Sequence, residues 1–416
     1  MFQILGWMCA FSSVAVIAAE SCPGTCWKLS ADGNSVEQVD FSDLDLLGSS
    51  SVELIVDGKP TSIPLANAWR LELTGNSEHV EPQSWPLLAF ANGDVWPVAR
   101  IKLDQEELSV WPDAHSGPLV VQLDALSSVY WAGPVEHGHV IPTSANVDDA
   151  STPLKATDVV HLLNHDELRG EVSALDAQQL QLTTSLGDLQ IPIAQIQCLD
   201  FNPDLIAEPS HTHVRYLVQL ANGARLSVDS MKFTDTDQIG LSLLSGQTWN
   251  CPKAWLHSID FISPTTQPLT WLPLREVTQR SYFGEHLPTV FDGSQTFSPL
   301  QLDDRQFPHG LGTRSQSAVT WSLPLQARRL CVIAGLQNTD KPLSHVTVEV
   351  WGRIHNEAEF QRVSDAVKLT PKHPSVLLGP LDVSGMAELR LQTGFGRNAD
   401  IGDCVNWCVP TLWSGK

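Results

Sequence analysis

The stretch Val346-Thr347-Val348-Glu349-Val350-Trp351 decides the fold class of the C-terminal part of this chain. Its valines alternate with Thr347, Glu349 and Trp351, a period of two that lines one face of a β-strand with apolar side chains. A strand with one apolar face needs a facing sheet to cover it. Many such short segments, separated by Gly, Pro, Asn and Asp turns, predict an all-β sandwich or jelly roll.

Ordered motifs surround these strands. Gly310-Leu311-Gly312-Thr313 precedes the strand-like Ser317–Trp321, and Leu381–Gly385 forms a turn before Glu388–Leu391. The acidic loop Gly402-Asp403-Cys404-Val405-Asn406-Trp407 follows. In this order the motifs resemble the NPCBM domain, a family of carbohydrate-binding modules.

The resemblance begins at Thr270–Leu274, includes Phe291–Gly293 and runs to Trp413. It implies a galactose-binding-like β-sandwich (jelly roll) that binds a carbohydrate or glycan. The chain departs from the family pattern at two positions. Arg314 stands where the family has His after Gly-x-Gly-Thr, and Cys404 replaces His in the Asp-His-x-x-Trp pattern.

The predicted ligand site lies on the loops that join residues 308–314 and 403–407. His309 and Arg314 can donate hydrogen bonds to sugar hydroxyls, and Asp403 can accept them. Trp407, with Trp321 as a second aromatic candidate, can stack on a sugar ring. The alternative is that Asp403 caps a turn and that both tryptophans fill the core.

The first two thirds of the chain repeat themselves. Asn92, Asn164 and Asn222 each stand in a turn signal, and a closing strand is centred 37, 35 and 37 positions later, respectively. A fourth copy is indicated because Ile63–Leu73 aligns with Ile191–Phe201. Self-similarity at this spacing predicts an array of one supersecondary unit.

Each unit is expected to contain a hairpin, two further strands, a short Ile-Pro segment and a final strand. Units of this size match small Sm-like or similar half-open β-barrels. The predicted boundaries are a signal peptide at 1–19, tandem repeats at 20–80, 81–150, 151–208 and 209–264, and the sandwich at 265–416. Spacers rich in Pro, Asp, Ser and Ala join the units around 134–155 and 202–210.

Composition restricts the partners. The chain holds 47 Asp and Glu against 25 Lys and Arg, a formal charge of −22, which repels phosphate backbones and excludes nucleic acid as a partner. The apolar stretch Phe2–Ala19 ends in small residues, as in a secretory signal peptide. An uncleaved anchor is the alternative. The prediction is a secreted, periplasmic or cell-envelope protein with no membrane span after signal removal.

Eight cysteines fit an oxidising compartment. Cys22 with Cys26 and Cys404 with Cys408 are two predicted pairings. A bridge from Cys331 to Cys404 or Cys408, or buried thiols, are the alternatives left open.

No catalytic motif stands out in the sequence. Two histidine pairs, His137 with His139 and His211 with His213, carry zinc or copper ligand chemistry, but solvated linker histidines are the favoured interpretation. Neighbouring carboxylates such as Asp148-Asp149 and Asp303-Asp304 are interpreted as surface charge. No cofactor is predicted, although Asp403 and the glycine loop carry oxygen ligands suited to calcium.

The resulting hypothesis is an exported, non-enzymatic protein that binds glycans through its C-terminal sandwich. The rival hypothesis is a cell-envelope scaffold that contacts envelope proteins and has lost sugar binding, which the changes at Arg314 and Cys404 favour. A carbohydrate-active enzyme with an unrecognised site in the repeats is the third.

Overall fold

The structure is a computed structural model. It describes residues 23–47, 50–74, 86–104, 107–114, 116–132, 139–140, 157–207, 210–234, 237–282, 288–303 and 305–414. Within these ranges the chain is built of β-strands and five short 3-10 helices, and it contains no α-helix. No helix of the described residues is long and apolar enough to cross a membrane. The predicted signal at 1–19 lies outside the described residues.

The N-terminal part forms four small β units. Unit 1 contains β1 (Gly24–Leu29), β2 (Val36–Phe41), β3 (Asp43–Leu47), β4 (Ser51–Val56), β5 (Lys59–Pro64) and β6 (Ala68–Leu73). Unit 2 contains β7 (Leu87–Phe90), β8 (Val95–Pro97), β9 (Arg100–Asp104), β10 (Glu107–Trp111), β11 (Leu119–Val121), η1 (Leu123–Ala125) and β12 (Leu126–Tyr130).

Units 3 and 4 share one order of elements, with five strands each and a 3-10 helix before the last strand. Unit 3 contains β14 (Asp158–Leu162), β15 (Glu167–Leu175), β16 (Gln179–Thr184), β17 (Gly187–Pro192), η2 (Ile193–Gln195) and β18 (Ile196–Asp200), followed by η3 (Pro203–Leu205). Unit 4 contains β19 (Tyr216–Leu220), β20 (Arg225–Phe233), β21 (Gln238–Leu243), β22 (Thr248–Pro252), η4 (Lys253–Trp255) and β23 (Leu256–Phe261).

The three repeated asparagines occupy equivalent turns, as the sequence register predicts. In each turn the Asn Oδ1 accepts a hydrogen bond from the backbone N–H two residues later, at 3.1 Å for Asn92, 3.1 Å for Asn164 and 3.0 Å for Asn222. The residue after each Asn has a positive φ, which Gly93 and Gly223 adopt without strain. The shared turn fixes the register of the hairpin that follows.

The sheets of the units are open. In units 3 and 4 the first strand pairs with both the second and the last, as β19 does with β20 and β23. Among the described residues, the pairing registers join the fourth strand of each of these units to its third strand and not to its last. The predicted Sm-like barrels are therefore not shown, because the sheets of the described residues do not close, and each unit leaves a strand edge for its neighbours.

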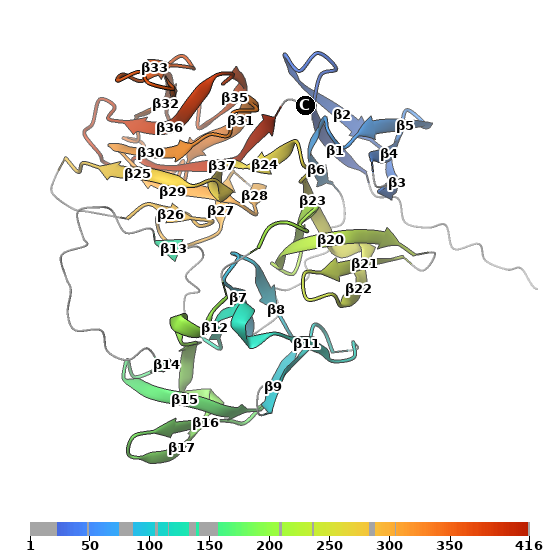
Figure 1. Ribbon diagram of the computed structural model, residues 1–416, viewed down its shortest axis with the longest axis vertical. Coiled ribbons are helices and arrows are strands. Elements are labelled where there is room, and N and C mark those ends of the chain that lie inside the picture. The colour runs from blue at the N-terminus through green and yellow to red at the C-terminus, as the bar shows by residue number, and fades with distance from the viewer. Residues whose placement is uncertain are drawn as a thin grey trace, which may run out of the picture.

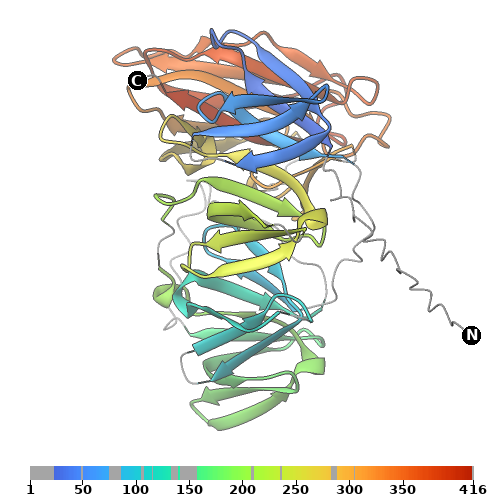
Figure 2. The same ribbon diagram turned by 90° about the vertical axis from the view of Figure 1, so that its right-hand side faces the viewer.

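The units use these edges to form a column whose order differs from the sequence. Strand β12 of unit 2 pairs antiparallel with β18 of unit 3, and β23 of unit 4 pairs in the same way with β6 of unit 1. Strand β8 of unit 2 meets β20 of unit 4. The spatial order is therefore 3, 2, 4, 1, with unit 1 beside the sandwich (Figures 1 and 2).

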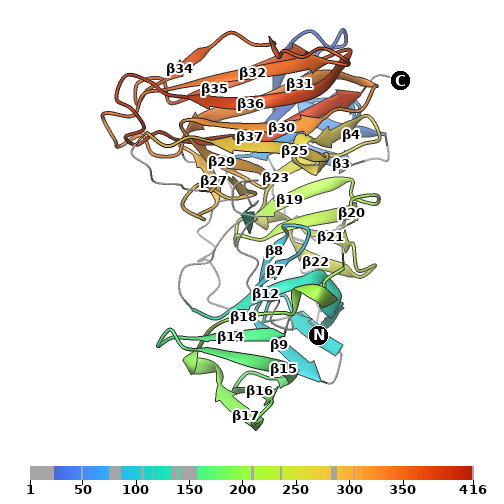
Figure 3. The same cartoon turned by 60° about the vertical axis from the view of Figure 1, so that its left-hand side comes forward.

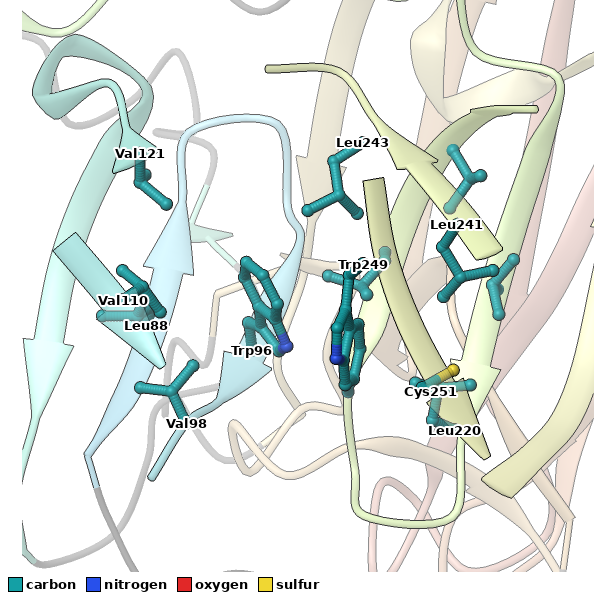
Figure 4. Packing of buried hydrophobic residues seen from close by; sticks show 14 of the residues in the cluster. Leu88, Trp96, Val98, Val110, Val121, Leu220, Leu241, Leu243, Trp249 and Cys251 are labelled. Atoms are coloured by element: carbon teal, nitrogen blue, oxygen red, sulfur yellow. The ribbon is translucent and has the colours of Figure 1, made fainter. Parts of the chain in front are cut away.

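A single apolar core runs through all four units, from Cys26 to Phe261. Trp96 of unit 2 and Trp249 of unit 4 face each other within it, with ring centroids 5.2 Å apart (Figure 4). Because a unit of this size buries too little apolar surface by itself, stacking supplies the shared core.

The C-terminal part is a two-sheet sandwich, visible as stacked layers in Figure 3. One sheet has the order β13-β26-β29-β37-β31-β35, with β24 also on β37, and the other has the order β25-β30-β36-β32-β33, with β34 on β32. The strands and the one 3-10 helix are β13 (His139–Val140), β24 (Thr266–Pro268), η5 (Leu269–Trp271), β25 (Leu274–Gln279), β26 (Val290–Phe291), β27 (Leu300–Leu302), β28 (Arg305–Phe307), β29 (Gly310–Arg314), β30 (Ser317–Ser322), β31 (Ala327–Leu336), β32 (Val346–Ile354), β33 (Gln361–Arg362), β34 (Val367–Leu369), β35 (Ser375–Asp382), β36 (Met386–Gly394) and β37 (Cys404–Ser414).

Val346, Val348 and Val350 are completely buried, which confirms the strand face predicted from their alternation. Strand β13 comes from the region between units 2 and 3, where the sequence predicts only a spacer, and it extends the first sheet by pairing with β26.

Among the described residues, Cys26, Cys251, Cys331, Cys404 and Cys408 are free thiols. Cys404 and Cys408 lie on the same extended strand, where four residues span roughly 13 Å, beyond the reach of a disulfide. The predicted Cys404–Cys408 pairing is therefore wrong, and Cys22 lies outside the described residues.

Candidate functional site

The residues predicted to bind a ligand divide between the two ends of strand β29. His309 precedes its first residue and Arg314 is its last. The strand pairs with β37 in the register Gly310 with Cys408 and Arg314 with Cys404. Because five strand residues span roughly 17 Å, His309 lies far from the Arg314 end. We call these the interface end and the loop end of the sandwich.

At the interface end, His309 faces the units instead of a ligand. Its side chain is buried, with Nε2 3.7 Å from Oδ2 of Asp260 in unit 4. Oδ1 of Asp260 accepts a hydrogen bond of 2.6 Å from Arg70 of unit 1. Burial, assisted by Arg70, lowers the pKa of His309 to about 3, so its imidazole is neutral. His309 therefore belongs to the contact between the sandwich and the units.

The same contact contains a tryptophan chain. Trp69 of unit 1 packs edge-on against Trp27 and Trp413, at centroid distances of 6.2 and 6.0 Å, and its Nε1 donates to Thr411 Oγ1 at 2.9 Å. Arg70 also donates to the carbonyl oxygen of Gln306 at 3.0 Å. These apolar and charged contacts hold the sandwich against units 1 and 4.

Trp321 and Trp407 are core residues with no exposed surface. Trp407 Nε1 donates to Thr313 Oγ1 at 3.2 Å and to Thr393 Oγ1 at 3.1 Å, which ties the two sheets together. Trp321 packs edge-on against Phe291 at 6.2 Å. A buried ring cannot stack on a sugar, so the core alternative describes both tryptophans.

At the loop end, Asp403 joins three loops. It is completely buried, and its two carboxylate oxygens accept hydrogen bonds of 3.0 Å from Ser315 Oγ and from the His345 backbone N–H. Burial, with a smaller contribution from the charge of Asp400, raises the pKa of Asp403 to about 6. Asp403 positions the loops and does not reach a ligand itself.

Asp400 likewise holds the segment that carries Tyr282 through hydrogen bonds. It is also buried, and its Oδ2 accepts from the Tyr282 backbone N–H at 3.0 Å and from Ser281 Oγ at 3.3 Å. Its main-chain carbonyl accepts from Arg314 at 3.4 Å. The Arg314 side chain, partly exposed, is thereby held at the surface of this end.

An aromatic pair projects from the loops so fixed. Tyr282 is 63% exposed and meets Phe395 edge-on at a centroid distance of 5.7 Å. The neighbouring Gly396 is required by close packing, because a Cβ there would lie 1.4 Å from the His345 carbonyl oxygen. His345 Nδ1 accepts from the Arg397 backbone N–H at 3.2 Å, which leaves Nε2 as the protonated ring nitrogen.

The loop end thus combines an exposed aromatic surface with polar groups held by buried carboxylates. Aromatic faces bind the apolar side of a pyranose, and guanidinium and imidazole N–H groups donate to hydroxyls. The sequence prediction includes Arg314 and Asp403 and does not include Tyr282, Phe395 or Asp400. The run Gly396–Asp400 just before the acidic motif, with its Arg, Asn and Asp, is the signal that could have found this loop.

No group of three or more His, Cys, Asp or Glu side chains that could hold a metal occurs in the described part of the chain. Asp403 is completely buried, and each of its oxygens accepts one hydrogen bond. His211 stacks on Trp271 at 3.9 Å, whereas His213 is exposed. His137, Asp148, Asp149 and Asp304 lie outside the described residues.

The fold is a β-sandwich carried on an array of small β units. Residues 266–413 are an NPCBM/NEW2 domain. Comparison with curated proteins gave no match.

Among solved structures, the chain is similar to the CBM51-2 and INT domains of Clostridium perfringens ZmpB, solved in complex with GlcNAc. The identity is 18%, the TM-score is 0.30, and the match covers 46% of this chain and 42% of that one. It is also similar to the CBM51 of Clostridium perfringens GH95 in complex with methyl-galactose, at 16% identity and a TM-score of 0.30. That match covers 36% of this chain and 99% of the other.

Proposed function

We propose that the protein is a non-catalytic glycan-binding protein and that the loop end of its sandwich holds the sugar. The observation that carries the proposal is the exposed Tyr282 packed edge-on against the half-buried Phe395, with Tyr282 and Arg314 both hydrogen-bonded to Asp400. The NPCBM/NEW2 domain at 266–413 supports the ligand class.

Binding fits the loop end better than hydrolysis does. Glycosidases need two carboxyl groups that reach the scissile bond from the solvent side. The carboxylates here, Asp400 and Asp403, are 1% and 0% exposed and serve as hydrogen-bond acceptors for the loops. A sugar would stack on Tyr282 and Phe395, and Arg314 would donate to its hydroxyls.

A glycan array probed with the full-length chain tests the ligand class, and isothermal titration with the best glycan tests the site. The Tyr282→Ala variant should bind roughly tenfold more weakly, because removal of one stacking ring costs on the order of 1 to 2 kcal/mol. Leu325→Ala, at a side chain 89% exposed, is the control. Unchanged affinity of Tyr282→Ala would remove the site from the loop end.

A scaffold function is the second candidate, and the changes at Arg314 and Cys404 favour it. In that case no glycan on the array binds the full-length chain. For either function we propose export directed by residues 2–19, which N-terminal sequencing of the mature chain tests. We propose that the four units hold the sandwich away from its attachment point, within the boundaries predicted above.

A further inference from the structure

A cavity lies outside the sandwich, where units 2 and 4 meet. Its volume is about 370 Å³, within the size range of small-molecule sites. Its apolar wall comes from both units, with Phe90, Trp96 and Val121 on one side and Leu226 and Leu243 on the other. Trp96, Val121 and Leu243 are seen on the two sides of this contact in Figure 4.

Three carboxylates line the same cavity, namely Asp94, Asp124 and Asp229. Asp124 and Asp229 are exposed at the rim. Asp94 is surrounded by protein but keeps accessible surface, and its two oxygens accept from the Ser227 N–H at 2.8 Å and from Ser227 Oγ at 2.7 Å. Burial raises the pKa of Asp94 to about 6, against the effect of those hydrogen bonds.

The described lining contains no Lys or Arg, and His213 is the one basic side chain in it. The nearest buried cation is Arg225, which lowers the pKa of Asp94. Arg225 Nη1 donates to the carbonyl oxygens of Asp292 and Pro308, at 2.9 and 3.4 Å, and so also serves the contact with the sandwich. The cavity wall itself therefore carries excess negative charge on an apolar surface.

We propose that this cavity binds a small organic cation with an apolar body, that is, an aromatic or aliphatic amine. The ammonium group pairs with Asp94 or with the rim carboxylates, where a charge-assisted hydrogen bond outweighs a neutral one. The apolar body lies against Phe90, Leu226 and Leu243. Anions are excluded by the same carboxylates. The proposal is independent of glycan binding, because the cavity shares no residue with the loop end.

Isothermal titration of the full-length chain with phenethylamine, and with 2-phenylethanol as its neutral counterpart, tests this inference. We expect saturable binding of the amine with a Kd on the order of 1 mM or below. The alcohol should bind at least roughly tenfold more weakly, because it keeps the apolar body but loses the charge-assisted hydrogen bond.

Two variants locate the site. Asp94→Asn should weaken amine binding by roughly tenfold. Asp229→Asn should weaken it by about two- to threefold, since this side chain is exposed and screened. Asp57→Asn, an equal charge change in a turn of unit 1 at φ 50°, is the control and should bind like the parent.

Equal affinity for amine and alcohol would overturn the proposal. So would absence of amine binding at millimolar concentration, or parent-like binding by both cavity variants. Since Asp229 lies at the surface, its variant keeps the test decisive if Asp94→Asn fails to fold. Glycan binding measured on the same samples separates failure here from failure of the proposed sugar site.

Discussion

A buried aspartate lies at each end of strand β29, but one end contacts the units and the other carries exposed side chains. Each holds a buried aspartate with a pKa raised to about 6, Asp260 at the interface end and Asp403 at the loop end. Asp260 is paired with Arg70 and closed off by units 1 and 4, whereas Asp403 holds loops that carry exposed side chains. At both ends the buried carboxylate therefore holds neighbouring segments together. Whether a ligand can bind at that end depends on whether the surrounding side chains are exposed.

The largest effect should come from breaking the interface end. Arg70→Met removes the partner of Asp260 in a pair whose side chains are 2% and 3% exposed. Loss of one partner of a buried pair costs about 3 to 5 kcal/mol, because the other charge stays buried. Urea denaturation at pH 7 measures the free energy of unfolding.

Arg169→Ala is the matched control for this prediction. Arg169 pairs with Glu167 at 3.0 Å, but both side chains are about half exposed. An exposed pair contributes about 1 kcal/mol or less. If both variants lose the same free energy of unfolding, the buried Arg70–Asp260 pair has no special structural role.

A second prediction concerns the packing of the loop end. Gly396→Ala places a methyl group against the His345 carbonyl oxygen and displaces the loop that carries Phe395. Overpacking of this kind costs about 1 to 3 kcal/mol. We expect a lower Tm in thermal denaturation together with weaker glycan binding.

Gly117→Ala provides the comparison, because a Cβ at Gly117 meets nothing within 4 Å. That variant should keep the parent's Tm and glycan affinity. If Gly396→Ala also keeps both, the close approach of this loop to His345 has no part in forming the site.

A third prediction uses pH to measure the cost of the buried charge at the loop end. The pKa of Asp403 is about 6 when folded, against the ordinary 3.8, so the folded state holds this proton more tightly. Its ionisation therefore reduces stability as the pH rises from about 4 through 6, and the loss is complete above pH 6. Asp403→Asn removes that loss while its amide can still serve both Ser315 and His345.

The free energy of unfolding of Asp403→Asn, relative to the parent, should thus improve between pH 4 and pH 7 by roughly 2 kcal/mol. Asp32→Asn gives a control of opposite sign in a lower pH range. Hydrogen bonds from Ser30 and Asn34 lower the pKa of Asp32, so that variant should lose relative stability as the pH rises toward about 4 and change little above it. A pH-independent difference for Asp403→Asn would contradict the assignment.

The smallest effect on stability is expected for Arg314→Ala. Its side chain is partly exposed, so the free energy of unfolding should change by no more than about 0.5 kcal/mol. Glycan affinity should nevertheless fall, because a hydrogen-bond donor is lost from the loop end. Arg362→Ala, at an arginine whose side chain is half exposed and pairs with Glu349, is the control. Glycan binding that survives Arg314→Ala would leave the aromatic pair as the site without this arginine.

Local patterns in the sequence determined much of this fold. The alternation around Val348 gave the strand face, and the spacing after Asn92, Asn164 and Asn222 gave the repeated hairpin, because a turn fixes the register of the strands beside it. The ordered glycine and acidic motifs were sufficient to indicate the NPCBM domain. Each of these signals depends on residues that are close together in the chain.

Only the tertiary structure decided which end of β29 faces the solvent. Arg70, Asp260 and His309 lie 190 and 49 positions apart in the sequence, and they meet because units 4 and 1 pair through β23 and β6. That pairing follows from open sheet edges and a shared core, and neither of these produces a recognisable pattern in the local sequence. For the same reason the sequence could not show that Trp321 and Trp407 are enclosed while Tyr282 is exposed: exposure depends on what the rest of the chain covers.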